Sequence, residues 1–311
     1  MREISRQDIF NRVYEGIREL NVRIPADVRQ ALTAASAAET GLGKKVLERI
    51  LENIELAKDK QRPVCQDTGM LLGLITIGTG VRIAGEEIAP HSGADRHFIG
   101  SIIEEATEAA YRDGFFRKSV VSDPLKQRTN SDTNLPPVLH YELVPGDGLE
   151  IALLAKGFGS ENCSAIHMLK PTAGKEEVLA AVVDTVRRAG GSPCPPTVLG
   201  IGIGGTMEKA ALLSKRALLR DLSASHPDPW YAELEAEILA AVNKLGIGPG
   251  GLGGRTTSLA VKVETYPTHI AGLPVAITVN CWADRKLILS WPSQTTGAEG
   301  AAGPAESGKA E

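Results

Sequence analysis

The chain of 311 residues lacks a long apolar run, has few aromatic residues and carries almost balanced charge. Its apolar stretches, such as Val198–Ile203, are too short to span a bilayer. Aromatic residues make up 4% of the chain, and its 34 Lys and Arg residues, set against 38 Asp and Glu, form no long basic run. These absences argue against a membrane-spanning protein and against nucleic acid as the main ligand.

The N-terminal residues also lack the apolar core of a signal peptide, and the chain has only four cysteines. We therefore predict a cytoplasmic protein, in which thiols stay reduced and do not form a framework of disulfides. Reduced cysteines in that compartment are available as thiolate ligands for a metal centre.

Apolar residues at helical spacing predict a helical N-terminal region over the first sixty residues. Further along, helices and strands are mixed without strict alternation, which indicates an α+β (mixed α/β) fold with a mixed sheet. Residues 138–144 and 149–154 have the pattern of strands, and the Pro-Gly-Asp-Gly between them predicts a β-hairpin. We expect the functional residues to lie on loops of this core.

The composition changes near the C-terminus. Residues 292–311 are mostly small and polar, with almost nothing to bury, so we predict a disordered tail there and one domain over residues 1–291. The 33 glycines instead cluster at residues 200–205 and 246–254, where they indicate sharp turns or close packing. The first cluster lacks the GxGxxG pattern of a dinucleotide loop, so close packing is the better interpretation.

Three of the four cysteines lie in peptides that would present a thiolate at a backbone turn. Cys65 lies in RPVCQDTG, Cys194 in SPCPP and Cys281 in VNCWADR. Three thiolates from distant loops are typical of an iron–sulfur cluster in which one iron stays open and acts as a Lewis acid. No CxxC pair is present, so the spacing alone favours three ordinary buried thiols.

Several longer peptides resemble a single family and occur in that family's order. They are VCQDTG, KGFGSEN, CPP followed by GIGGT, GIGP and YPTHIAGLP. On these motifs the chain resembles the α subunit of the two-subunit class I fumarate hydratases. The same iron–sulfur hydro-lyase family contains L-tartrate dehydratase. The resemblance covers nearly everything from the first helix to about Arg285.

The resemblance implies a [4Fe–4S] cluster held by Cys65, Cys194 and Cys281, with one iron left open for an oxygen ligand. That iron could polarise the C–OH bond that is made or broken, without a redox change. Cys163 stands where the family pattern has no cysteine. We expect it to be a small apolar residue near the site and not a ligand.

A dicarboxylate substrate carries two negative charges and requires cations and N–H donors in its pocket. By resemblance, Arg117 binds a substrate carboxylate, and Gln66 and Asp67 contact the substrate beside the open iron. Asp67 is also a candidate for proton transfer at the hydroxyl, although DTG alone would indicate a simple turn. Gly159 would donate a backbone N–H, whereas Lys156 could merely pair with a surface acid.

His269 matches a family histidine near the active site, and the resemblance therefore makes it a candidate catalytic residue. A lone histidine is more often structural, and this alternative stays open. The other half of the site comes, in this family, from a β domain or subunit, and no second half is found in this sequence. We therefore predict a separate β subunit and an αβ heterodimer or higher heteromer.

The predicted reaction is the reversible hydration of fumarate to L-malate. The segments that favour it are Gly159–Asn162, Thr256–Thr257 and Tyr266–Pro274. L-tartrate dehydration and mesaconate hydration share its chemistry and are the alternatives. A non-catalytic cluster-binding sensor is a more remote one, because a sensor would not need the carboxylate-binding residues Gln66, Asp67 and Arg117.

Overall fold

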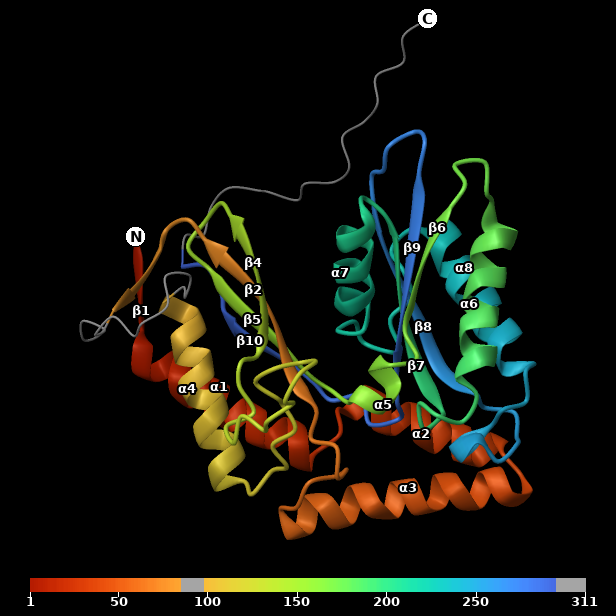
Figure 1. Ribbon diagram of the computed structural model, residues 1–311, viewed down its shortest axis with the longest axis horizontal. Helices are drawn as coiled ribbons and strands as arrows, with labels where there is room; N and C mark the ends of the chain where they lie inside the picture. The colour runs from red at the N-terminus through yellow and green to blue at the C-terminus, as the bar shows by residue number, and fades with distance from the viewer. Residues whose placement is uncertain (85–97, 295–311) are drawn as a thin grey trace, which may run out of the picture.

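The computed structural model describes residues 1–84 and 98–294 (Figure 1). It contains two four-stranded sheets and a short two-stranded one, with helices packed against the sheets. The predicted α+β class is confirmed. Most of the tail predicted over residues 292–311 lies outside the described residues. Within the described part, no helix is both long enough and apolar enough to cross a membrane.

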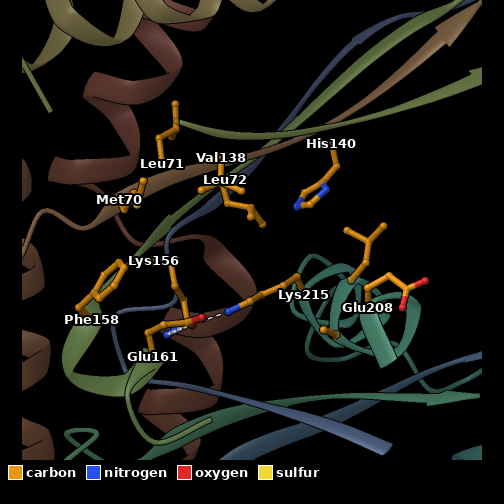
Figure 2. Close-up of a pocket in the computed structure, with 12 residues that line it drawn as sticks. Met70, Leu71, Leu72, Val138, His140, Lys156, Phe158, Glu161, Glu208 and Lys215 are labelled. Atoms are coloured by element: carbon orange, nitrogen blue, oxygen red, sulfur yellow. Dashed lines mark hydrogen bonds and ion pairs between the residues drawn. The ribbon is translucent and has the colours of Figure 1, made fainter. Parts of the chain in front are cut away.

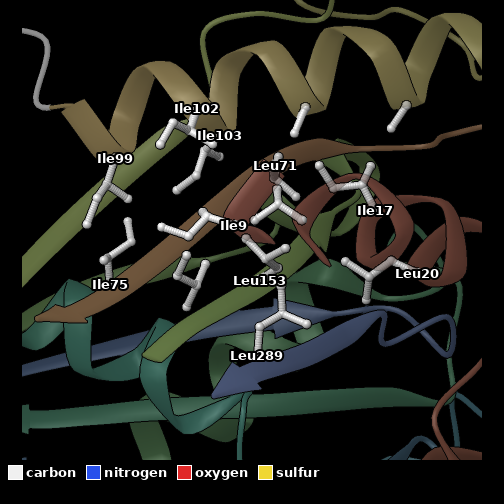
Figure 3. Close-up of a cluster of buried hydrophobic side chains, with 14 of the residues drawn as sticks. Ile9, Ile17, Leu20, Leu71, Ile75, Ile99, Ile102, Ile103, Leu153 and Leu289 are labelled. Carbon is white, nitrogen blue, oxygen red and sulfur yellow. The ribbon is translucent and has the colours of Figure 1, made fainter. Parts of the chain in front are cut away.

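The first sheet carries two helices on one face (Figure 1). Its strands, in spatial order, are β10 (Lys286–Trp291), β5 (Leu149–Lys156), β2 (Met70–Gly78) and β4 (Val138–Val144). The helices are α1 (Arg6–Val22) and α4 (Phe98–Asp113). Figure 3 shows the apolar core between them, which includes Ile9, Ile17, Leu71, Ile75, Ile102, Ile103, Leu153 and Leu289.

The predicted hairpin of residues 138–144 and 149–154 is wrong in its pairing. Both strands form, but β2 lies between them, parallel to β4 and antiparallel to β5. The turn passes over the end of β2, where Gly78 N donates to Gly148 O at 2.8 Å and Gly80 N to Gly146 O at 2.7 Å. A Cβ added at Gly78 would lie 2.5 Å from Gly146 O, so glycine makes this close crossing possible.

The second sheet has helices on both faces (Figure 1). Its strands, in spatial order, are β6 (Ala165–Leu169), β9 (Leu273–Asn280), β7 (Thr197–Gly204) and β8 (Ser258–Tyr266). Helix α7 (Met207–Ala217) covers one face, and α6 (Lys175–Ala189) and α8 (Pro229–Asn243) cover the other. A Cβ at Gly202 would lie 2.0 Å from Ala210 O, so the glycines of β7 do allow close helix packing.

Smaller elements complete the fold. Helices α2 (Ala26–Ala38) and α3 (Gly41–Lys60) lie across the lower end of the sheets in Figure 1. The sequence patterns did not reveal β1 (Arg2–Ser5), which pairs in parallel with β3 (Val81–Ala84). Two single-turn helices, α5 (Phe158–Glu161) and η1 (Pro249–Gly251), interrupt loops. The apolar residues Leu72, Leu154, Val198 and Leu218 form one buried cluster that joins the two sheets.

Candidate active site

The three cysteine loops lie at strand ends contributed by both sheets. Cys65 precedes β2, Cys194 precedes β7, and Cys281 links β9 to β10. Trp282 N donates to Cys194 O at 3.4 Å, and Cys65 and Cys281 pack against the same apolar cluster. Burial raises the pKa of the Cys194 and Cys281 thiols, and the neighbouring Cys65 raises both pKa values further. The fold therefore brings together the three cysteines that are far apart in the sequence.

The backbone at Cys194 is unusual. Its φ of 53° lies in the left-handed region, which non-glycine residues rarely adopt and which is often found at functional sites. Among residues 1–84 and 98–294, no three His, Cys, Asp or Glu side chains are arranged to hold a single metal ion. A [4Fe–4S] cluster makes a different demand, because each cysteine binds a separate iron of the cube.

The surroundings of the cysteines are suited to an anionic group. Arg285 is 1% exposed, its Nε has no hydrogen-bond partner, and it makes no ion pair with any residue in the described ranges. Its positive charge lowers the pKa of Cys281, against the larger opposite effect of burial. Three thiolates around a cluster of charge +2 would carry one net negative charge. The donor set and the unpaired cation thus fit such a cluster.

Asp67 joins the Cys65 loop to the loop at Gly157. Its Oδ1 accepts a hydrogen bond from Gly69 N at 3.0 Å, and its Oδ2 accepts one from Phe158 N at 2.8 Å. Gly69 has a φ of 78°, and a Cβ there would lie 2.9 Å from the carbonyl of Lys156. The segment can therefore turn only with glycine at this position.

Gln66 and Arg117 lie on the same set of loops. The exposed Gln66 accepts a hydrogen bond from Cys65 Sγ at 3.3 Å. The carbonyl of Arg117 accepts one from Thr68 Oγ1 at 2.6 Å, which attaches the Arg117 segment to the Cys65 loop. The Arg117 side chain is exposed and has no ion-pair partner among the described residues, so it remains available to a ligand.

Gly159 lies within α5, which replaces part of the loop predicted over residues 156–162. A Cβ at Gly159 would lie 3.8 Å from Ser192 O, so α5 sits beside the Cys194 loop. Cys163 follows α5 and donates to Gly159 O at 3.4 Å, and it packs against the core of the second sheet. Helix α5 thus lies between the loops of Cys65 and Cys194.

Lys156 is buried, contrary to the expectation that it could pair with an acid at the surface. It is 4% exposed, and its Nζ lies 2.7 Å from Ser160 Oγ and 3.4 Å from the half-buried Glu161. Burial lowers the pKa of Lys156 to about 8, although Glu161 opposes this shift. Figure 2 shows Lys156, Glu161 and Lys215 along one wall of a largely apolar cavity of about 340 Å³.

His269 is not brought to the cysteines within this chain. It is exposed on the turn between β8 and β9, which Thr268 Oγ1 ties to Gly205 O at 2.9 Å. The whole length of β9 separates this turn from Cys281, a distance of about 26 Å at ~3.3 Å per residue. Figure 1 shows the turn at the end of the sheet that is opposite α2 and α3. The catalytic role of His269 stays a prediction.

Other residues that shape the site carry no motif. The fully buried Tyr111 donates through its hydroxyl to Thr68 O at 2.9 Å and to Gly69 O at 3.2 Å. Asn21, also fully buried, accepts from Arg285 Nη1 at 3.2 Å through its side chain. Of these three residues, Arg285 alone had a sequence signal, because it stands four residues after the predicted ligand Cys281.

Comparison with known proteins identifies the family. The family model described as "Fumarate hydratase (Fumerase)" matches residues 10–289. The chain belongs to this family. A putative L(+)-tartrate dehydratase subunit alpha of Methanocaldococcus jannaschii is 40% identical over 280 residues, covering 89% of this chain and 95% of the relative. The L(+)-tartrate dehydratase subunit alpha of Escherichia coli K12 is 31% identical over 294 residues, covering 92% and 93%.

The family predicted from the sequence motifs is therefore confirmed, and with it the class of hydro-lyases. The predicted preference for fumarate is not supported to the same degree. Both of these relatives of the fumarate hydratase family carry the name of tartrate dehydratase, which was the alternative. Both are also named as alpha subunits, which implies a partner subunit for those proteins.

Proposed function

We propose that this chain is the α subunit of a [4Fe–4S] hydro-lyase that eliminates water from a four-carbon hydroxy-dicarboxylate, with L(+)-tartrate as its first candidate substrate. The observation that carries the proposal is the convergence of three cysteine loops from two sheets beside an unpaired buried arginine. The names of the relatives support tartrate as the substrate. The description of the family model supports fumarate and L-malate as the second candidate pair.

Cys65, Cys194 and Cys281 would hold the cluster. When bound, the cluster supplies an open iron that acts as a Lewis acid toward the substrate hydroxyl. In this state Cys65 has lost its proton, so it no longer donates to Gln66. The Gln66 amide is then free to hydrogen-bond a substrate carboxylate or hydroxyl.

Arg117 would bind a carboxylate of the substrate, and Asp67 would act at the substrate hydroxyl. The exposed guanidinium of Arg117 can bind a carboxylate through two parallel hydrogen bonds. Asp67 is positioned by the two backbone N–H groups that it accepts, and each of its oxygens keeps a lone pair for a substrate hydroxyl proton. Gly159 can approach the substrate closely because it has no side chain.

A β subunit would complete the site and bind this chain in a heteromer of the cytoplasm. Arg117 is the one cation among the residues that we assign to the substrate, whereas a dicarboxylate requires cations for two carboxylates. The missing cation and a further acid–base group are assigned to the partner. The α chain alone should therefore bind the cluster but not turn over substrate.

The substrate is tested with the αβ complex, reconstituted with iron and sulfide without oxygen. Rates are compared for L(+)-tartrate, L-malate and 2-methylmalate. We expect the highest kcat/KM with L(+)-tartrate. Dominant turnover of L-malate, with negligible turnover of tartrate, would contradict the substrate choice and restore fumarate hydration.

The ligand assignment is tested on cysteine variants of the same complex. Replacing Cys65, Cys194 or Cys281 with Ser should abolish activity and strongly reduce iron and sulfide content, because serine is a poor ligand for these irons. The matched control is Cys163→Ser, which should keep the cluster. Arg117→Ala should keep the cluster too but raise KM. Loss of the cluster from Cys163→Ser with retention in Cys194→Ser would overturn the assignment.

A further inference from the structure

Arg285 is the largest side chain with almost no exposed surface in the described chain. Its guanidinium makes a hydrogen bond from Nη1 to Asn21 Oδ1 at 3.2 Å, while its Nε has no partner. No carboxylate of the described residues forms an ion pair with it, although Arg220, a half-buried arginine, is paired with Glu235 at 2.7 Å. The Asp67 carboxylate lies near the guanidinium but forms no ion pair with it, so this buried cation carries a desolvation cost that no direct ion pair within the described residues offsets.

The guanidinium of Arg285 lies close to the loop at Gly157 and to the segment that leads into Cys65. A Cβ added at Gly157 would lie 3.8 Å from Arg285 Nη2 and 3.2 Å from Asp67 Oδ2, which places both side chains at the same glycine. Asn21, which binds the guanidinium, also accepts a hydrogen bond from Val64 N through its carbonyl at 2.8 Å. Arg285 is thus held directly behind the peptide that carries Cys65.

The backbone keeps Arg285 in this place. Its carbonyl accepts from Ala155 N at 3.0 Å at the start of the pairing between β10 and β5. Cys281, four residues earlier, belongs to the same connection between the two sheets. These backbone contacts fix the Cα of Arg285 beside the first sheet, and the burial of its side chain keeps the guanidinium inside the fold and away from solvent.

We propose that Arg285 is a positioning residue whose counter-charge is the anionic cluster, so that it retains the cluster and makes it easier to reduce. This inference rests on the proposed function, because it requires a cluster at the three cysteines. A cation near a metal centre raises the reduction potential, since it stabilises the reduced and more negative form. Without the cluster, the same charge destabilises the fold.

The same substitution should therefore have opposite effects in the chain without cluster and in the chain with cluster. Arg285→Met keeps most of the side-chain volume and removes the charge. In the full chain without cluster, the variant should unfold at the same urea concentration as the wild type or at a higher one. In the reconstituted chain, it should release iron at least about tenfold faster in the presence of a chelator, as expected for the loss of an outer-shell partner.

Two further variants control the experiment. Arg285→Lys keeps the positive charge and should restore most of the cluster retention and most of the reduction potential, whereas Arg285→Met should shift the potential to more negative values. Arg220→Met breaks an existing ion pair with Glu235, so it should lower the urea midpoint of both states and leave iron release unchanged.

Each outcome decides the inference. If Arg285→Met unfolds at lower urea without cluster, or fails to fold, the residue is structural and the proposal is overturned. Iron release and potential equal to those of the wild type overturn it as well, while the proposed function stands. A wild-type chain that takes up no iron and sulfide overturns the proposed function itself, and the role of Arg285 with it.

Discussion

Replacement of Tyr111 by Phe should weaken the fold at neutral pH by about 1–2 kcal/mol. Tyr111 is fully buried, and its hydroxyl serves two carbonyls of the Cys65 loop, those of Thr68 and Gly69. The Gly69 carbonyl keeps a donor, because Asn134 Nδ2 lies at 3.1 Å, whereas Thr68 loses the phenol. The ring can keep its edge-to-face contact with Phe116, so the hydroxyl is the main loss.

The deficit should depend on pH in a defined direction. Burial raises the pKa of Tyr111 to about 12, above the ordinary value of 10.0. Between these pH values the folded wild type keeps a proton that the unfolded chain releases, so its stability falls as pH rises, by ~1.4 kcal/mol per pH unit. The Tyr111→Phe variant has no phenol at this position, so its stability does not fall for this reason. The difference between the two proteins should therefore shrink above pH 10 and vanish near pH 11.

Urea unfolding followed by circular dichroism at pH 8, 10 and 11 measures both effects, provided that the m-values of the two proteins agree. The matched control is Tyr14→Phe, whose hydroxyl donates to Asp113 Oδ2 at 3.1 Å on the surface. It should cost less than about 0.5 kcal/mol. A deficit of Tyr111→Phe that stays constant from pH 8 to 11 would refute the reasoning.

Three further changes test other parts of the site. Gly69→Ala should lower the free energy of unfolding by about 2–4 kcal/mol, because φ is positive and the new Cβ meets the Lys156 carbonyl at 2.9 Å; Gly272→Ala, which has nothing within 4 Å, should cost less than about 0.5 kcal/mol in the same urea titration. With the pKa of Lys156 lowered to about 8 from 10.5 by burial, the folded state releases a proton earlier than the unfolded one. The wild type should therefore gain about 3 kcal/mol over Lys156→Met between pH 7 and 10.5, and equal urea midpoint changes for both would contradict this. His269→Ala should leave iron and sulfide content unchanged, since a strand's length separates it from Cys281; loss of the cluster on metal analysis would show that the distance argument fails.

The sequence predicts which segments form helices and strands better than it predicts their pairing. The apolar runs that became β2, β4 and β5 all have the expected pattern. The turn residues around Gly146 predict a hairpin because turn chemistry is local. It carries no information about which strand each flanking segment pairs with. The insertion of β2 depends on the backbone crossing at Gly78, which is a tertiary contact that no local pattern records.

For the site too, the sequence predicts which residues belong to it better than it predicts the contacts that they make. Motifs place Cys65, Gln66, Asp67 and Arg117 in one region, because these residues lie on loops after helices α3 and α4 whose order the family shares. The lack of an ion pair at Arg285 among the described residues could not be predicted, because it depends on every element that packs around the guanidinium.

His269 illustrates a different difficulty. Its motif is specific, but a motif carries no information about which end of β9 faces the cysteines. Lys156 is similar, because a lysine in a polar, glycine-rich peptide gives no sign that its amine is enclosed by the fold.

During synthesis, β2 leaves the ribosome long before either strand that will pair with it in its sheet. Its nine residues carry no charged side chain, and both of its edges stay open until β4 and β5 have been made. At elongation rates of about 5–20 residues per second, the roughly eighty intervening residues take about 4–16 s. An apolar strand with unpaired edges is a template for association with other chains. Aggregation during expression should therefore begin at Met70–Gly78, while Cys65 is still the only site cysteine that has been synthesised.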